Sequence, residues 1–539
     1  MPTVSATSLP EADTLPALLA RQLPLHANDT ALVLGGRHYD WLTLDTMARE
    51  TAAWLAGQGI GHGDRVAVWM VNRVEWLALL FGLAHLGAAL VAVNTRYRAS
   101  ELEHILAQSA ARMLVLQPGF RKIDFQTVLQ EVDPKAKFAL EKIAVVDAPA
   151  GLASHMLGAP TVAFAPGSPE TAPPQRATPD AMAVLFPTSG TTRGPKLVIH
   201  SQRTLVLHAS EMARAYGLAE AGAGVLGALP LCGALGLNGV LAGFAAGAPV
   251  VLMETFDGAE AAGLLREHRL THAWGSDAMF RQILAHGPEG HDPFPTARQF
   301  GFGAFQSGAE TFARQASERR VPMVGVYGSS ELQAAFSRQP LTLPAAQRIE
   351  GGGQPAMAQA EVRIRDAASG ALLPAGASGN LEVRAATSFT GYFDDPEASA
   401  TAFTDDGFFR TGDVARMRGD GSFVFEGRVG DALRLAGFLV NPLDIEEVLR
   451  AQPGVADAQA VAVDIDGEPR CVAFVVPHAG TRLSAPDVIH GAARQMAPFK
   501  VPARVWLVDS FPTTPGPNGV KVQRSALRAA ALRHLAAEA

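Results

Sequence analysis

Short apolar runs alternate with helix-length stretches in the first part of the chain, and this order constrains the fold more than any other feature. The clearest case is Arg65–Met70, followed by Val74–Leu86 and then Ala89–Val93. A strand, a helix and a second strand in this order form a βαβ unit, which places the two strands parallel in one sheet. The sequence therefore predicts an α/β fold built on layers of parallel sheet.

The pattern changes after about Gly351, where short strands and turns take over, with a hairpin signal at 418–422. A length of 539 residues allows three to four structural units of roughly 150 residues each. We predict a large domain over 1–430, with parallel-sheet layers and a small β-barrel-like part, and a small mobile α/β domain over 431–539. The small domain is predicted from a helix at 443–450, strands near 458–463 and 471–476, a helix near 485–495 and a strand near 504–508.

Residues 221–253 contain no charged side chain, which exceeds the roughly 18 residues that suggest a transmembrane helix. Glycines, together with Pro230 and Pro249, would interrupt such a helix and leave it poorly packed. We therefore interpret the segment as buried strand, turn, helix and strand. It forms either the wall of an apolar pocket or part of the core, and the second meaning is the commoner one.

Charge and cysteine content exclude several classes of protein. The 45 basic and 52 acidic residues give a net charge of −7 without a long run of one sign, which argues against nucleic-acid binding. Two cysteines, Cys232 and Cys471, cannot build a disulfide scaffold or a four-thiolate zinc site. No basic region precedes an apolar run near the start, so we expect a cytoplasmic protein without a secretory signal. Peripheral membrane contact and a homo-oligomer stay open.

The strongest chemical signal is the run Thr188–Lys196, which follows the predicted strand Ala183–Phe186. Its hydroxyls, glycines and lysine present O–H donors, backbone N–H groups and a cation to a polyanion such as triphosphate. The spacing differs from a Walker loop, because Gly190 and Gly194 enclose three residues and Pro195 precedes the lysine. A polar turn that contains a lysine by chance is the simpler alternative, which the length of the pattern disfavours.

Two weaker signals, for a dinucleotide site and for a metal site, are rejected. The run Gly301–Gln306 starts like a dinucleotide fingerprint but lacks the third glycine, so NAD binding is rejected. His268 and His272 are four residues apart on a predicted helix, with no carboxylate or third ligand beside them. We interpret them as paired surface histidines rather than a metal site.

Together with four motifs further along, the run Thr188–Lys196 resembles the adenylate-forming superfamily. This superfamily includes acyl- and aryl-CoA synthetases, firefly luciferase and the adenylation domains of peptide synthetases. The likeness extends from about Ala31 to Arg528, and Gly391-Tyr392 stands where the family has Gly-Tyr. The downstream motifs, in the family's order, are Tyr327-Gly-Ser-Ser-Glu331, Thr411-Gly-Asp413, Gly427-Arg-Val-Gly-Asp431 and Asn518-Gly-Val-Lys521.

The resemblance implies a site for ATP. Asp413 would accept hydrogen bonds from both ribose hydroxyls, Arg428 would also contact the nucleotide, and Tyr327 would stack on the adenine. Glu331 would bind Mg²⁺, with Thr188 as a second ligand, because a hard cation that bridges phosphates requires hard oxygens. The other ATP-binding residues that the family implies are Ser189, Gly190, Thr191, Thr192, Lys196, Ser307, Gly308, Ala309, Gly328 and Ser330.

Lys521 is implied as the catalytic residue of the first half-reaction, together with Glu331. A substrate carboxylate and the α-phosphate of ATP repel each other, and a cation between them stabilises the charge that develops in the transition state. Asp431 resembles the family's hinge. About this hinge the small domain would swing and bring residues around Gly437 to a channel for coenzyme A.

The implied enzyme is an AMP-forming acyl-CoA ligase, which converts a carboxylate and Mg·ATP to an acyl-adenylate and then to the thioester of coenzyme A. Gly233, Ala234 and Leu237 would line the acyl pocket. Gly233 stands where many relatives carry a histidine or another bulky group, so with the glycine-rich wall it suggests a roomy channel for a medium- or long-chain fatty acid. The alternatives are an aryl or branched acid and transfer to a carrier protein.

Some positions depart from the family pattern. Arg193 and Leu197 occupy places where glycine is usual, and the motif that ends at Lys521 is one residue longer than the usual Gly-Lys. A nucleotide-binding protein that has lost catalysis is therefore a further alternative.

Overall fold

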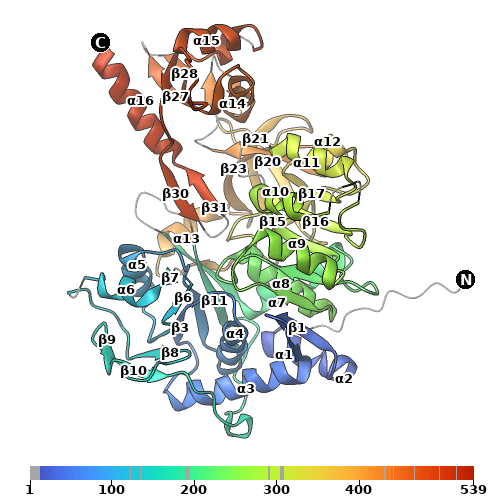
Figure 1. Cartoon of the computed structure of the whole chain (residues 1–539), viewed down its shortest axis with the longest axis vertical. Helices are drawn as coiled ribbons and strands as arrows, with labels where there is room; N and C mark the ends of the chain where they lie inside the picture. The colour runs from blue at the N-terminus through green and yellow to red at the C-terminus, as the bar shows by residue number, and fades with distance from the viewer. Residues whose placement is uncertain are drawn as a thin grey trace, which may run out of the picture.

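The computed structural model contains two large sheets with helices on their faces, followed by a smaller α/β unit at the C-terminus (Figure 1). This arrangement confirms the α/β fold predicted from the sequence. The residues that the structure describes are 12–121, 123–133, 135–188, 195–288, 290, 292–303, 309–429, 433–435, 438–440, 442–465, 468–496, 498–516 and 519–538.

The first sheet contains the predicted βαβ unit. Strands β3 (Arg65–Trp69) and β4 (Ala89–Ala92) pair in parallel, and α4 (Val74–Leu86) connects them. The order of the strands is β22 (Gly391–Tyr392), β12 (Leu197–Ser201), β11 (Met182–Pro187), β4, β3, β5 (Met113–Leu116), β8 (Lys142–Val145), β10 (Ala159–Ala163) and β9 (His155–Met156). The short strands β6 (Gly119–Phe120) and β7 (Ile123–Asp124) form a separate pair.

Local signals place the helices near this sheet. The Asp40 carboxylate accepts a hydrogen bond from the backbone N of Thr43 at 2.7 Å and so caps α3 (Trp41–Gly57). Helix α4 ends at Gly87, which has a left-handed φ of 72°. The main buried core joins α3 and α4 to α7 (Gln202–Ala215) and α8 (Ala234–Ala246). The other helices of this region are α1 (Leu15–Ala20), α2 (Leu23–His26), α5 (Ala99–Ser109) and α6 (Phe125–Gln130), with the 3₁₀ turn η1 (Pro169–Thr171).

The second sheet has 13 strands among the described residues, and its first half after β2 is parallel. The second half is antiparallel, so the predicted β-barrel-like part continues the parallel sheet. The order is β2 (Arg37–Asp40), β1 (Thr30–Leu34), β14 (Val250–Leu252), β13 (Val225–Gly227), β15 (His272–Ser276), β16 (Gln299–Gly303), β17 (Met323–Tyr327), β18 (Ser337–Arg338), β19 (Gly352–Pro355), β24 (Phe423–Arg428), β23 (Phe409–Met417), β21 (Ser378–Arg384) and β20 (Glu361–Arg365).

Four helices among the described residues connect the parallel strands of the second sheet, as βαβ order requires: α8 (Ala234–Ala246), α9 (Gly258–Glu267), α10 (Asp277–His286) and α11 (Ala309–Glu318). Helices α7 (Gln202–Ala215) and α13 (Pro396–Ala402) lead from strands of the first sheet to strands of the second, and α12 (Ala345–Arg348) lies between β18 and β19. The predicted hairpin at 418–422 joins β23 to β24, where the backbone N of Arg418 donates to the carbonyl of Ser422 at 2.7 Å.

The uncharged segment 221–253 forms β13, α8 and β14, as predicted. Helix α8 is buried, with Leu237 and Leu241 both 0% exposed. The interpretation as a buried strand, helix and strand is therefore confirmed. Within the described ranges, no helix combines the length and apolar character needed to cross a membrane.

The two histidines interpreted as a surface pair on one helix do not have that arrangement. His268 follows the end of α9, and His272 begins β15 with 1% of its surface exposed. The ring of His272 bonds through Nε2 to the carbonyl of Tyr216 at 2.8 Å and through Nδ1 to Oγ1 of Thr271 at 2.8 Å. The prediction was wrong because a left-handed residue, Arg269, ends the helix between them.

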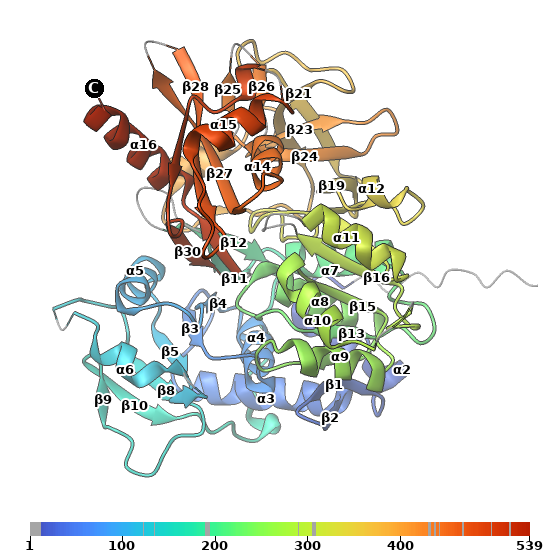
Figure 2. The same ribbon diagram turned by 45° about the horizontal axis from the view of Figure 1, so that its top comes forward.

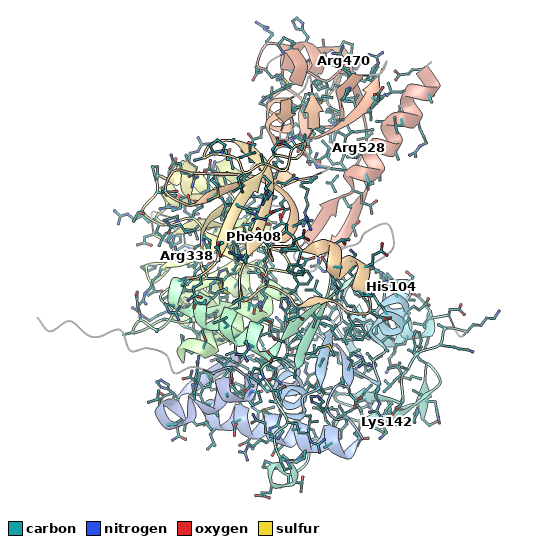
Figure 3. The ribbon with its side chains drawn as sticks, turned by 180° about the vertical axis from the view of Figure 1, so that it is seen from behind. His104, Lys142, Arg338, Phe408, Arg470 and Arg528 are labelled. Atoms are coloured by element: carbon teal, nitrogen blue, oxygen red, sulfur yellow. The ribbon has the colours of Figure 1, made fainter. Side chains whose placement is uncertain are left out.

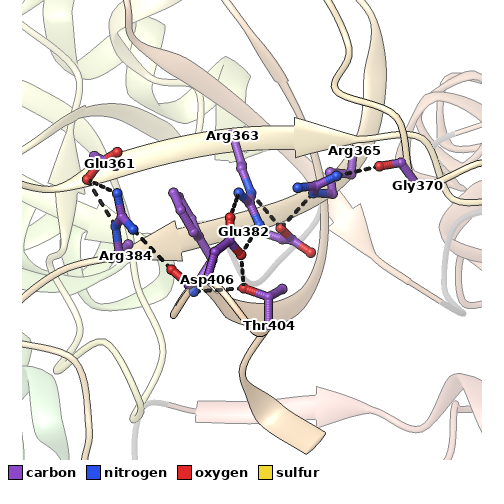
Figure 4. A network of polar contacts seen from close by, with 9 residues as sticks. Glu361, Arg363, Arg365, Gly370, Glu382, Arg384, Thr404 and Asp406 are labelled. Carbon is purple, nitrogen blue, oxygen red and sulfur yellow. Dashed lines mark hydrogen bonds and ion pairs between the residues drawn. The ribbon is translucent and has the colours of Figure 1, made fainter.

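The outer strand β20 and its neighbour β21 carry a network of charged side chains (Figure 4). Glu382, with 8% of its side chain exposed, accepts from Nε of Arg363 at 2.7 Å and from Nε of Arg365 at 3.2 Å. Arg363 also binds Asp406, and Arg384 binds Glu361. Charges on an outer strand disfavour pairing with a strand of another molecule, so this edge is protected against aggregation.

The C-terminal unit has its own buried clusters, which contain residues from Leu433 onward. Figures 1 and 2 show it as the red part at one end, and Arg470 and Arg528 mark it in Figure 3, far from Lys142. The predicted elements are confirmed, whereas the boundary at 430/431 stays a prediction. The elements are β25 (Leu433–Leu435), β26 (Phe438–Val440), α14 (Pro442–Arg450), β27 (Val455–Ile465), β28 (Glu468–Pro477), α15 (Ala485–Ala493), η2 (Pro498–Lys500), β29 (Arg504–Leu507), β30 (Thr513–Gly516), β31 (Gly519–Val522) and α16 (Arg524–Glu538).

Buried histidines make the stability of the large domain depend on pH. Burial lowers the pKa of His200 and of His272 to about 4 and that of His208 to about 3. Below pH 6.5 the unfolded chain therefore binds protons that the folded chain excludes, so stability falls as the pH falls from 7 to about 4. Each histidine contributes a slope of at most about 1.4 kcal/mol per pH unit.

We expect the unfolding temperature, followed by tryptophan fluorescence, to fall steadily from pH 7 to pH 5. His272→Gln should reduce this slope, because its side chain does not titrate there. His155→Gln, at an exposed site, is the matched control and should leave the slope unchanged. An equal slope for all three proteins would contradict the prediction.

Candidate active site

The run Thr188–Lys196 connects two antiparallel strands of the first sheet, β11 and β12. The backbone N of Thr188 donates to the carbonyl of Lys196 at 2.8 Å, and the N of Lys196 donates to Oγ1 of Thr188 at 3.0 Å. Nε2 of His104 on α5 donates to the carbonyl of Pro195 at 3.0 Å. The base of the loop is thus closed, whereas the predicted phosphate contacts Ser189, Gly190, Thr191 and Thr192 lie outside the described residues.

Lys196, Tyr392 and Glu331 form one connected group. Nζ of Lys196 lies 4.6 Å from the centroid of the Tyr392 ring, and the Tyr392 hydroxyl donates to Oε1 of Glu331 at 3.0 Å. Burial and the charge of Glu331 raise the pKa of Tyr392. The pairing of β22 with β12, in which Tyr392 lies opposite Val198, brings the tyrosine to this place.

The backbone on both sides of Glu331 is also fixed. Nε2 of His200, on β12, donates to the carbonyl of Ser330 at 2.8 Å. The backbone N of Phe389 donates to the carbonyl of Glu331 at 2.8 Å. Glu331 is therefore held through its main chain and through its side chain.

These residues fit a magnesium ion bound with ATP. Oε1 of Glu331 accepts the Tyr392 hydroxyl, and within the described part of the chain Oε2 has no hydrogen-bond donor. Mg²⁺ is commonly held by one or two carboxylates together with substrate phosphates. When bound, the ion would neutralise charge on the phosphates. Glu331 would hold it, and the hydroxyl of Thr188 is the second predicted ligand.

A second carboxylate, that of Asp413, contacts Tyr327, the last residue of β17. The Tyr327 hydroxyl donates to Oδ2 of Asp413 at 2.5 Å, and Nε of Arg428 lies 2.9 Å from Oδ1. Asp413 and Arg428 are opposite each other in the β23–β24 ladder, and Asp413 is 2% exposed. Burial and the charge of Asp413 raise the pKa of Tyr327, so its hydroxyl stays protonated and donates.

The ring of Tyr327 packs between aromatic side chains rather than standing alone. Its centroid lies 5.3 Å from that of Phe423 and 5.4 Å from that of Phe425. Tyr327 is 6% exposed. Stacking of this ring on adenine stays a prediction.

The structure thus brings together the predicted residues Glu331 and Lys196 on one side, and Tyr327, Asp413 and Arg428 on the other, at the two ends of the segment 327–331. Gly328 in this segment is packed tightly, since a Cβ there would lie 2.6 Å from Cα of Ala334. Ser307, Gly308, Asp431 and Gly437 lie outside the described residues. Ala309 is described as the first residue of α11.

Lys521 lies on β31, where it is opposite Thr514 of β30, and its side chain is outside what the structure describes. Both Figure 1 and Figure 2 show the β30–β31 hairpin extending from the C-terminal unit toward β11. Strand β11 leads into the run Thr188–Lys196. The catalytic role of Lys521 stays a prediction.

The predicted acyl-pocket residues lie at the start of α8, where Gly233 precedes its first turn and Ala234 and Leu237 follow. Cys232 beside them is buried, and burial raises the pKa of its thiol to about 11, so it is not a nucleophile at neutral pH. Cys471 is also buried and free.

Two glycines of the wall that suggested a roomy channel, Gly236 and Gly239, are sites of close packing, and so is Gly301. A Cβ at Gly301 would lie 2.7 Å from Cδ1 of Trp274 and 3.0 Å from Cγ1 of Val326. A Cβ at Gly239 would lie 3.2 Å from Cε3 of Trp274, and one at Gly236 would overlap the carbonyl of Pro230. The indole of Trp274, which is 3% exposed, therefore fills the space between α8 and β16.

Sequence reasoning missed the functions of Tyr392, His200 and His104. The Gly391-Tyr392 motif was visible, but its contact with Glu331 depends on strand pairing between segments far apart in the chain. Nothing in the local sequence indicates that His104 bonds to the loop at Pro195 or that His200 bonds to the backbone at Ser330.

Comparisons with known proteins agree with this geometry. The model of the AMP-binding enzyme family matches residues 19–393, and that of the AMP-binding enzyme C-terminal domain matches residues 444–516. The chain therefore belongs to the AMP-binding enzyme family, and the resemblance to the adenylate-forming superfamily is confirmed. It is an AMP-forming ligase.

Similar proteins span nearly the whole chain. The 3-hydroxybenzoate–CoA ligase of Aromatoleum sp. (strain CIB) is 28% identical over 90% of this chain and 91% of its own length. A 3-[(3aS,4S,7aS)-7a-methyl-1,5-dioxo-octahydro-1H-inden-4-yl]propanoyl:CoA ligase of Mycobacterium tuberculosis (strain ATCC 25618 / H37Rv) is 31% identical over 93% of this chain and 96% of its own. The fold is that of O-succinylbenzoate coenzyme A synthetase from Bacillus subtilis, solved with ATP and magnesium ion, at 21% identity, a TM-score of 0.78 and coverage of 95% of this chain and 98% of that one.

The link between Tyr392 and Glu331 can be tested by Tyr392→Phe. Loss of one hydrogen bond to a carboxylate should raise the Mg²⁺ concentration that half-saturates the ATP-dependent reaction by roughly tenfold, because such bonds contribute about 1.5 kcal/mol or more. Tyr39→Phe is the matched control, since Tyr39 also carries a cation on its ring, from Arg37 at 4.9 Å, in a distant strand. Equal magnesium dependence of both variants would refute the link.

Proposed function

We propose that the chain is an ATP-dependent coenzyme A ligase for a compact, ring-containing carboxylic acid. A carboxylate oxygen of the acid attacks the α-phosphorus of ATP, the bond to pyrophosphate breaks, and an acyl-adenylate forms. The sulfur of coenzyme A then attacks the acyl carbon, its proton passes to solvent, and AMP leaves with the electron pair of the broken C–O bond. The products are the thioester, AMP and pyrophosphate.

One observation supports this function most. The segment 327–331 carries a tyrosine bonded to the buried carboxylate of Asp413 at one end and, at the other, Glu331, which Tyr392 links to Lys196. In this proposal the ribose acceptor and the phosphate- and cation-binding group lie at the two ends of the segment 327–331, which leads out of β17. Such fixed charges stabilise a transition state because they need no reorganisation.

The close packing of Gly239 and Gly301 on Trp274 favours a compact acid over the fatty acid suggested by the glycine content. Gly239, which packs on Trp274, lies six residues after Gly233, which is about 9 Å along the axis of α8. In this proposal the carboxylate lies near Gly233 and the indole sets the depth of the pocket. The two relatives named above are, by their names, ligases of ring-containing acids, which agrees with this assignment.

The exchange of labelled pyrophosphate into ATP, screened over aryl, alicyclic and straight-chain acids, tests the proposal. We expect exchange with ring-containing acids, and we expect Lys521→Ala to reduce it at least 100-fold with little change in nucleotide binding, because only the charge in the transition state is affected. Multiple turnovers, measured as release of AMP, should also require coenzyme A.

Other outcomes separate the alternatives. Turnover without coenzyme A but with a carrier protein would favour the carrier-loading enzyme. Preference for long straight chains would restore the fatty acid. Exchange that is absent for every acid would indicate a nucleotide-binding protein without catalysis, and unchanged exchange in Lys521→Ala would refute the role of that lysine.

The depth of the acyl pocket can be tested separately with Trp274→Ala. We expect the ratio of kcat/KM for decanoate to that for benzoate to rise at least tenfold, since deletion of the indole opens space between α8 and β16. Trp274→Phe keeps a large ring and serves as the control. If both variants keep the ratio of the unmodified enzyme, Trp274 does not determine specificity.

A further inference from the structure

Three consecutive residues that are not glycine adopt left-handed backbone conformations directly after Glu331 and Leu332. Their φ angles are 60° for Gln333, 54° for Ala334 and 40° for Ala335. L-residues avoid this region because Cβ approaches the following carbonyl oxygen, and it is seldom occupied by several residues in succession. Such a turn persists only where surrounding contacts hold it, and this kind of strain is typical of functional sites.

Gln333 supplies these contacts through its side chain and its main chain. Gln333 is 0% exposed, and its Nε2 donates to the carbonyl of Thr204 at 2.8 Å and to the carbonyl of Thr387 at 2.7 Å. The main-chain carbonyl of Gln333 accepts a hydrogen bond from Nδ2 of Asn238 at 2.8 Å. One glutamine thereby joins α7, α8 and the segment that leads from β21 to β22.

The left-handed turn packs against the segment that carries the site. The backbone N of Ala334 donates to the carbonyl of Ser329 at 2.8 Å. Gly328 lies so close to Ala334 that it has no room for a side chain. The placement of the turn therefore determines where the chain between Tyr327 and Glu331 can lie.

We propose that Gln333 is a positioning residue for the first half-reaction. By holding the turn at 333–335, it fixes Glu331 relative to α8, the helix at whose start the acid is proposed to bind. Through Thr387 it also restrains the chain just before Phe389, which holds the carbonyl of Glu331. This role rests on the function proposed above.

Gln333→Met removes the two donated bonds and keeps most of the volume of the side chain. We expect it to lower kcat for acid-dependent pyrophosphate exchange about tenfold, while the dissociation constant for AMP without magnesium changes less than twofold. The dissociation constant for AMP should stay nearly constant because none of the hydrogen bonds described for Gln333 reaches Asp413 on β23 or Arg428 on β24. A loss of folding would change both kcat and this dissociation constant.

Ala334→Gly in the Gln333→Met background should restore kcat to within threefold of that of Ala334→Gly alone. Glycine adopts a φ of 54° without a steric penalty, so one of the three strained positions no longer needs to be held and the turn costs less to maintain. Gln202→Met is the matched control. Gln202 is also 0% exposed and also bonds to two distant backbone groups, N of Leu15 at 3.1 Å and the carbonyl of Ala84 at 2.9 Å, so it should lose thermal stability while keeping kcat.

Equal kcat for Gln333→Met and Gln202→Met, or failure of glycine to restore activity, would overturn the role of Gln333 and leave the proposed function intact. If the unmodified enzyme catalyses exchange with none of the acids tested, the proposed function fails. The claim that Gln333 holds the turn is then tested by thermal unfolding alone. If Ala334→Gly restores the thermal stability lost in Gln333→Met, the claim is supported, and if it does not, the claim is refuted. If Gln333→Met is insoluble, Gln333→Asn is compared with Gln202→Asn in the same way.

Discussion

Buried or half-buried carboxylates need donors, and in this chain two tyrosine hydroxyls meet that need. Tyr327 donates to Asp413, and Tyr392 donates to Glu331. A carboxylate that accepts a hydrogen bond keeps its charge and its orientation at a lower cost of desolvation. Both carboxylates are thus oriented by the protein's own hydroxyl groups, so the nucleotide proposed to bind here would need no large rearrangement of these dipoles.

The parts of the fold that depend on short-range patterns could be predicted from the sequence. The unit formed by β3, α4 and β4 follows from alternating runs of apolar residues, and the motifs around Glu331 and Asp413 stand at recognisable spacings. His272 was misplaced, because periodicity does not reveal that a helix ends at a left-handed arginine. Which side chains a motif contacts was also beyond the sequence, since the contact of Tyr392 with Glu331 needs β22 to pair with β12.

The glycines of the segment 221–253 illustrate a second limit of sequence reasoning. A glycine indicates that a side chain is missing, but the sequence does not reveal whether the space holds a ligand or a neighbouring group. At Gly239 and Gly301 the neighbour is Trp274, and at Gly236 it is the carbonyl of Pro230. The same composition that suggested a wide channel is therefore compatible with a short one. The left-handed turn has the opposite character, because Gln333, Ala334 and Ala335 stand where glycine would have been expected.

Strand β22 is two residues long, yet it adds a segment that lies in the chain between β21 and β23 of the second sheet to the edge of the first. Ile199 and Val198 of β12 hold it in register, and Phe389 beside it is bonded to Glu331. The two sheets are thus fastened to each other at the very place where the phosphates are proposed to lie. A movement that separated the two sheets would have to break the pairing of β22 with β12.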